Sequence, residues 1–136
     1  MTDTDKGGRT PLHYAALIND TNAVSQLLRE GINSSAGDRM GFTPLHFAAE
    51  AGSIAAAEIL LAAGAEVDAV NRYGNTPLFI AVFRSRGRGE LIQLLRRHGA
   101  NPRYLNNAGQ SPLGLARLIA NYNVDQFFAD LIDPGQ

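Results

Sequence analysis

The sequence contains no cysteine and no tryptophan, and a single lysine, Lys6, stands beside eleven arginines. Without cysteine, neither a disulfide framework nor a thiolate metal site can form. No uninterrupted apolar run approaches the roughly 18 residues that a transmembrane helix needs. The first residues, MTDTDKGG, are polar and lack the apolar centre of a secretory signal. We therefore expect a cytoplasmic protein that does not bind membranes.

A strong charge of one sign is also missing, since the net charge is −1 over 136 residues. A nearly neutral chain has no general affinity for nucleic acid or for a membrane surface. The charged residues are nevertheless unevenly distributed along the chain. Residues 48–71 contain four acidic residues and no basic one, whereas residues 84–103 contain six arginines and one acidic residue. The preference for arginine over lysine indicates a GC-rich coding sequence, so we expect a bacterial source.

A short phrase is repeated along the chain. It occurs as TPLHYAA at Thr10–Ala16, TPLHFAA at Thr43–Ala49, TPLFIAV at Thr76–Val82 and SPLGLAR at Ser111–Arg117. Successive copies begin 33, 33 and 35 residues apart. A period of about 33 residues that carries T-P-L-H-x-A is the signature of the ankyrin repeat, which consists of a β-turn and two helices. The chain therefore resembles an ankyrin-repeat protein from about Asp5 to its last few residues.

This resemblance implies an all-α fold, an α-solenoid of four ankyrin repeats in which two repeats are inner and two are capping. We expect a single domain over residues 1–136, with repeats at about 5–37, 38–70, 71–105 and 106–132. Each repeat carries a glycine in its turn, a Thr or Ser that caps a helix, and a proline at the first helical position. These signals predict helices over residues 11–18, 22–30, 54–62, 77–83, 89–97, 112–119 and 124–131. A further helix is expected from Thr43-Pro44 to just before Gly52.

The third and fourth repeats depart from the pattern. The two additional residues of the third repeat fall between its helices, within residues 84–90, where three arginines occur. Insertions in repeat proteins map to loops on one face, often the binding face. In the fourth repeat Gly114 replaces the histidine, and Tyr122, Phe127 and Phe128 supply bulk that we expect to close the end of the stack.

His13 and His46 are the residues that most invite a metal-binding or catalytic interpretation. They occupy the same place in successive repeats, and stacked helices lie roughly 8–10 Å apart. That separation is too large for both to bind one ion, because Zn–N bonds are about 2.0–2.1 Å. The resemblance implies instead that each histidine hydrogen-bonds to the Thr of its own motif. No phosphate loop, nucleophile elbow or H-E-x-x-H occurs, so we expect no enzyme, cofactor or metal.

Protein–protein interaction through the turn tips and the concave face of the first helices is the function that the resemblance implies. The residues predicted to bind the partner are Arg39, Met40, Phe42, Glu50, Arg72, Tyr73, Asn75, Phe83, Arg84, Arg86 and Arg88. Met40, Phe42 and Tyr73 are apolar or aromatic in turns that do not need such residues, and these types are enriched at interface cores. Packing of some of them against the neighbouring turn is the open alternative.

Arginine makes bidentate contacts with carboxylate and phosphate, so the expected partner is another protein with an acidic surface, bound by a monomer. Two other functions stay open at this point. One is an immunity or inhibitor protein that neutralises a bacterial toxin or enzyme. The other, less favoured, is nucleic-acid binding through the arginine-rich insert, which would show a steep salt dependence. For any single arginine, a solvated surface position is the simpler interpretation.

Overall fold

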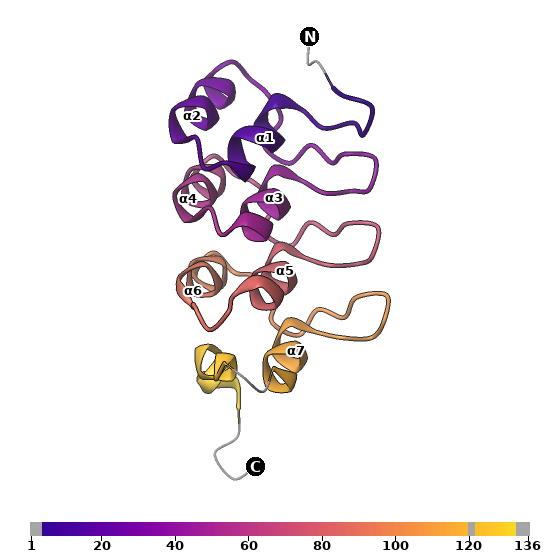
Figure 1. Ribbon diagram of the computed structural model, residues 1–136, viewed down its shortest axis with the longest axis vertical. Coiled ribbons are helices and arrows are strands. Elements are labelled where there is room, and N and C mark those ends of the chain that lie inside the picture. The colour runs from indigo at the N-terminus through magenta and orange to yellow at the C-terminus, as the bar shows by residue number, and fades with distance from the viewer. Residues whose placement is uncertain (1–3, 120–121, 133–136) are drawn as a thin grey trace.

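The structure is a computed structural model that describes residues 4–119 and 122–132. All regular structure in these residues is helical, without strands. The helices are α1 (Pro11–Leu17), α2 (Thr21–Arg29), α3 (Pro44–Ala51), α4 (Ile54–Ala62), α5 (Pro77–Arg84), α6 (Glu90–Arg97), α7 (Pro112–Leu118) and the 3₁₀ helix η1 (Val124–Leu131). They form pairs, each preceded by a turn, and the four units are stacked along the long axis (Figure 1). The predicted all-α solenoid is confirmed.

The stack has an inner and an outer row of helices. Helices α1, α3, α5 and α7 form the inner row, and the turns project from its side, while α2, α4, α6 and η1 form the outer row (Figure 1). Within each row a helix packs on the helix of the next unit, α1 on α3, α3 on α5 and α5 on α7. Because contacts are made between neighbouring units, the fold yields one extended surface on its inner side.

The helix boundaries follow from local chemistry. Thr43 has extended backbone angles, and its side chain accepts a hydrogen bond from the His46 N–H at 3.3 Å, which caps α3. Pro44 occupies the first helical position, where an absent N–H costs nothing. Gly52 then ends the helix with φ 72°, a left-handed conformation that a residue without Cβ adopts freely. The other inner helices also begin with a proline after Thr or Ser.

The predicted helices agree with the structure to within one residue at their ends, except in the last segment. Residues 124–131, predicted as α-helix, form a 3₁₀ helix with Phe128 at φ −125° inside it. Contacts with the preceding unit explain the difference. Phe128 is fully buried, and the Arg96 guanidinium donates to the Phe127 carbonyl at 2.9 Å and to both Asp130 carboxylate oxygens at 2.8 Å. These tertiary contacts outweigh the helical pattern, as is common for short terminal turns.

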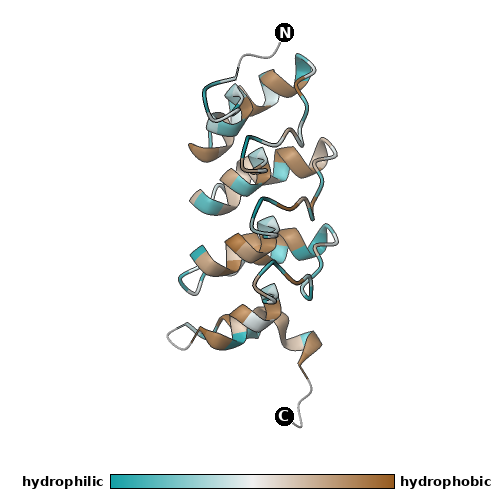
Figure 2. Ribbon diagram, turned by 90° about the vertical axis from the view of Figure 1, so that its right-hand side faces the viewer, coloured by the Kyte–Doolittle hydropathy of each residue, from teal (hydrophilic) through white to brown (hydrophobic). Residues whose placement is uncertain are grey.

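The core runs through all four layers. Leu12, Leu45 and Leu78 stand at one register of successive repeats and are fully buried, as is Leu60 of α4. Buried alanines of α3 and α4 let the helix rows approach closely. Hydrophobic residues recur on the helices of every layer (Figure 2). Among the described residues, no helix combines the length and the apolar character needed to cross a membrane.

Candidate protein-binding surface

The four turns share one geometry, which is set by the residue that begins each turn. The Oδ1 atom of Asp38 accepts hydrogen bonds from the N–H groups of Met40 and Phe42, both at 2.9 Å. The first residues of the other turns bind the N–H groups two and four positions ahead in the same way; they are Asp5, Asn71 and Asn106. Gly41 completes the turn at φ 78°, and a Cβ there would lie 3.0 Å from the Asn71 Cα. Each turn is therefore closed and fixed in shape.

Adjacent turns are joined through their backbones. The Arg39 N–H donates to the Gly7 carbonyl at 2.8 Å, and the Arg72 N–H donates to the Met40 carbonyl at 2.8 Å. The last junction is made by the Asn107 N–H and the Tyr73 carbonyl at 3.0 Å. The turns thus form one hydrogen-bonded row, and a surface that does not reorder on binding loses less entropy.

The two histidines connect each turn to the next repeat. His13 Nδ1 accepts from the Thr10 N–H at 2.9 Å, as expected, and its Nε2–H donates to the Phe42 carbonyl at 2.8 Å. His46 makes the same two bonds, to the Thr43 N–H at 3.0 Å and to the Asn75 carbonyl at 2.8 Å. A carbonyl can only accept, so Nε2 carries the proton in both rings. The bridge to the next turn was not foreseen, although its 29-residue spacing recurs in both repeats.

Burial keeps both imidazoles neutral. Desolvation lowers the pKa of His46 to about 4 and also lowers the pKa of His13, against the hydrogen bonds to the carbonyls, which favour the charged form. Both rings are fully buried. In the described part of the chain, no group of three potential metal ligands is found. The histidines hold the turns in place.

A first groove lies between the turns of repeats two and three and the helices α3 and α5. We call it the aromatic groove; its volume is about 230 Å³. It is lined by Phe42, Glu50, Asn71, Tyr73, Asn75, Phe79, Ile80, Phe83 and Arg84. Tyr73 is 52% exposed and Phe83 is 61% exposed, so two large apolar side chains of this groove are open to a partner. The groove therefore presents apolar surface from a turn and from a helix.

A second groove, which we call the arginine groove, lies between the end of α3 and the start of α6. Its volume is about 310 Å³, and its charged lining consists of Glu50, Arg84, Arg86, Arg88 and Glu90. The Arg84 guanidinium and the Glu50 carboxylate are 2.5 Å apart, and both residues line both grooves. Arg86 and Arg88 are exposed and form no ion pair with any residue that the structure describes.

The insert of the third repeat has a defined conformation. The Ser85 Oγ donates to the Val82 carbonyl at 2.9 Å, and the Arg88 N–H donates to the Ser85 carbonyl at 2.9 Å. Arg86 between them has φ 51°, a left-handed conformation that side chains with a Cβ rarely adopt. Such a conformation persists only where the surroundings impose it. The arginines of the insert are therefore carried by a closed turn.

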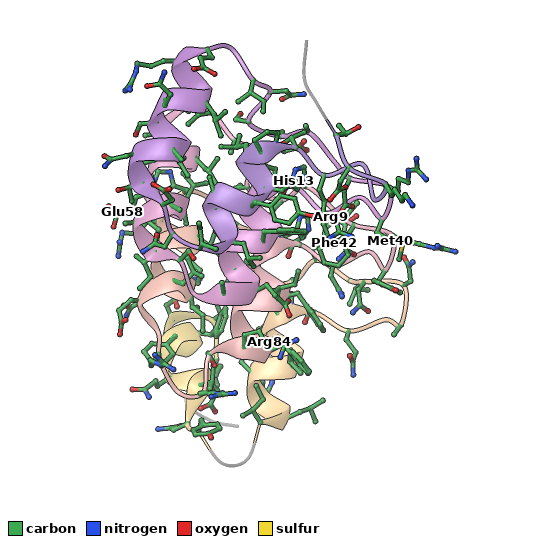
Figure 3. All side chains as sticks on the ribbon, turned by 45° about the horizontal axis from the view of Figure 1, so that its top comes forward. Arg9, His13, Met40, Phe42, Glu58 and Arg84 are labelled. Atoms are coloured by element: carbon green, nitrogen blue, oxygen red, sulfur yellow. The ribbon has the colours of Figure 1, made fainter. Side chains whose placement is uncertain are left out.

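Most of the predicted partner-binding residues meet in the two grooves. Those that line a groove are Phe42, Glu50, Tyr73, Asn75, Phe83, Arg84, Arg86 and Arg88. Arg39, Met40 and Arg72 lie in the turns but line neither groove, and Arg72 Nη1 is 3.6 Å from the Met40 sulfur. Figure 3 shows Met40 toward the turn tips, Arg84 on the inner row and Glu58 on the opposite, outer side.

Two groups of residues are less available than their sequence indicates. Met40 and Phe42 are half-buried, in line with the alternative that they pack against their surroundings. The centroids of the Phe42 and His46 rings are 5.6 Å apart in an edge-on arrangement. The basic stretch of residues 84–103 is also less available than its sequence suggests. Arg96 pairs with Asp130, and Arg84 pairs with Glu50. Pairing across repeats was not predicted, since it depends on side-chain direction.

Comparison with known families gives two matches. A family model described as ankyrin repeats (3 copies) matches residues 1–71, and a model described as ankyrin repeat matches residues 73–107. Together they cover the first three helix pairs and reach the turn of the fourth unit. Among curated proteins, none matches the chain.

Proposed function

The chain belongs to the ankyrin-repeat family, and we propose that it is a non-enzymatic module that binds another protein through its concave inner surface. Ankyrin repeats generally mediate protein–protein interaction. The observation that carries the proposal is the pair of adjoining grooves, in which exposed Tyr73 and Phe83 lie beside the arginines of the insert. Aromatic and arginine side chains are the types that dominate interface energetics.

The electrostatics of the surface favour an acidic partner. Arg86 and Arg88 are exposed cations in the arginine groove, and Arg39 and Arg72 are exposed on the turns. A positive rim accelerates encounter with a negative surface and disfavours basic partners. We further propose that the protein binds as a monomer in the cytoplasm.

The proposal is tested by affinity capture with the full chain as immobilised bait. Proteins retained from lysate of the source organism are quantified by mass spectrometry for the wild type and for a Tyr73→Ala, Phe83→Ala variant. Tyr104→Ala serves as the control, because Tyr104 is 37% exposed and lines neither groove. We expect a partner that the control retains and the groove variant loses. Equal retention by all three baits would show that binding uses another surface.

A further inference from the structure

The ion pair between Glu50 and Arg84 stands where the two grooves meet. Both side chains line both grooves, and they are 38% and 51% exposed. Exposed ion pairs contribute little to stability, typically about 0–1 kcal/mol. The pair is therefore easily exchanged for a pairing with an incoming charged group. A ligand that reaches both grooves must pass over it.

The arginine groove is suited to a carboxylate. Arg86 and Arg88 have no ion-pair partner among the described residues. The closed turn of the insert fixes the backbone from which their side chains extend. Planar guanidinium groups bind carboxylates through two parallel hydrogen bonds. Glu50 and Glu90 also line this groove, so its net charge is modest. A singly charged carboxylate matches that balance better than a doubly charged phosphate does.

The aromatic groove also has a buried polar side chain in its lining. Asn71 lines it and is only 6% exposed, and its Nδ2 atom has no hydrogen-bond partner in the described residues. At the next junction the equivalent atom, Asn106 Nδ2, donates to Asn75 Oδ1 at 2.8 Å. One repeat earlier, Phe42 occupies the position of Asn75 and offers no acceptor. The Asn71 Nδ2 donor is itself buried, so a bound segment does not reach it, and it does not define the ligand.

We propose that the two grooves together bind one segment of the partner protein, which carries an aromatic or large aliphatic side chain close to an Asp or Glu. The apolar side chain occupies the aromatic groove beside Tyr73 and Phe83. The carboxylate pairs with Arg86 and Arg88. This inference rests on the proposed function and specifies the ligand of the same surface.

Glu50 limits the affinity for such a segment. Its carboxylate holds Arg84 and repels the incoming carboxylate from a position that borders both grooves. Replacement by glutamine removes the like charge and frees Arg84 for the ligand. Glu50→Gln should therefore strengthen binding by about two- to fivefold, a change that corresponds to the usual range of surface charge interactions. If Glu50 only holds Arg84 in place, its replacement leaves binding unchanged or weakens it.

The test begins with short random peptides displayed on phage and selected against the immobilised full chain. We expect enriched peptides that combine an acidic residue with an aromatic or large aliphatic one. The dissociation constants of their synthetic forms are then measured against the Tyr73→Ala variant, the Tyr73→Ala, Phe83→Ala double variant and four further variants. Glu50→Gln should bind more tightly, and the Arg86→Gln, Arg88→Gln double variant about tenfold more weakly. The controls Glu58→Gln and Arg97→Gln, which change charge at exposed positions outside both grooves, should bind like wild type.

The outcomes separate the inference from the function on which it rests. Selection of no peptide, or of peptides without acidic residues, overturns the inference. So does a Glu50→Gln variant that binds like wild type or more weakly while the Tyr73→Ala variant loses affinity; the proposed binding surface would then stand. If neither the groove arginines nor Tyr73 and Phe83 affect binding, the surface itself is wrong. A phosphoserine peptide or a labelled oligonucleotide that binds where the selected acidic peptides do not would overturn the proposal that Arg86 and Arg88 bind a carboxylate.

Discussion

A single buried imidazole joins two repeats in this protein. His46 accepts the Thr43 N–H on one nitrogen and donates to the Asn75 carbonyl with the other, so it caps its own helix and holds the next turn. The bond from the Thr43 N–H requires the neutral ring, because a protonated Nδ1 cannot accept. Desolvation in this fully buried place lowers the pKa of His46 to about 4. Protonation of Nδ1 would also set a donor against the Thr43 N–H.

The lowered pKa makes stability depend on pH. The unfolded chain takes up the His46 proton near pH 6.5 and the folded chain only near pH 4, so the free energy of unfolding falls as the pH drops between these values. From pH 7 to pH 5 the loss should be about 2 kcal/mol. His46→Gln keeps a capping side chain at this position but does not titrate. Urea unfolding at both pH values should show a shallower pH dependence for this variant, and an unchanged dependence would contradict the account.

At the scale of the element, α4 shows how an inner repeat is held. Leu60 is fully buried in this helix, which packs against α2 and α6 as well as against its partner α3. Leu60→Ala should lower the free energy of unfolding by about 2–5 kcal/mol, since it removes buried methyl groups and leaves a cavity. Chemical denaturation measures this loss. Glu58→Ala in the same helix, at an exposed position, should change stability by less than about 0.5 kcal/mol. A loss below about 1 kcal/mol for Leu60→Ala would contradict the packing.

The last element depends on one arginine. Arg96 donates to both carboxylate oxygens of Asp130 and to the Phe127 carbonyl, and its guanidinium lies over the Phe128 ring, 5.2 Å from the ring centroid. These contacts fix η1 against α6. Arg96→Lys removes the planar guanidinium group, and the ammonium group of lysine cannot form the same paired hydrogen bonds.

We therefore expect faster hydrogen exchange in residues 124–131 of the Arg96→Lys variant, with no change in α1 to α4, because units contact only their neighbours. Hydrogen exchange measured by mass spectrometry distinguishes the two regions. Arg97→Lys is the matched control, since Arg97 is exposed and forms no ion pair with a described residue. Equal exchange in the two variants would contradict a role for Arg96 in holding η1.

The elements could be predicted from sequence where their signals are local. The capping Thr43 with Pro44 fixes the start of α3, and Gly52 fixes its end, so the helix follows from residues close in the chain. The 3₁₀ form of residues 124–131 could not be predicted, because contacts from Arg96 decide it. The Glu50–Arg84 pair was not predicted either, because it also depends on a contact between residues far apart in the sequence. Both residues were predicted to bind the partner. That binding stays a prediction.

At the scale of the whole molecule, the stack turns a local repeat into a continuous surface. Hydrogen bonds between turns and histidine bridges across the first two junctions hold the tips in one row. The third repeat has Phe79 in place of histidine, and Asn106 and Asn107 make the side-chain bonds to its turn instead. The turns that border the grooves between repeats two and three are therefore held by hydrogen bonds from both neighbouring repeats.

The most direct test of this account is isothermal titration of the captured partner with the Tyr73→Ala variant. Tyr73 is an exposed aromatic side chain in the aromatic groove. Its loss should weaken binding by about 2 kcal/mol or more, roughly thirtyfold, if it is a central anchor. Tyr104→Ala, outside both grooves, should bind like wild type. Wild-type affinity of a correctly folded Tyr73→Ala variant would contradict the claim that this protein binds its partner through the concave grooves.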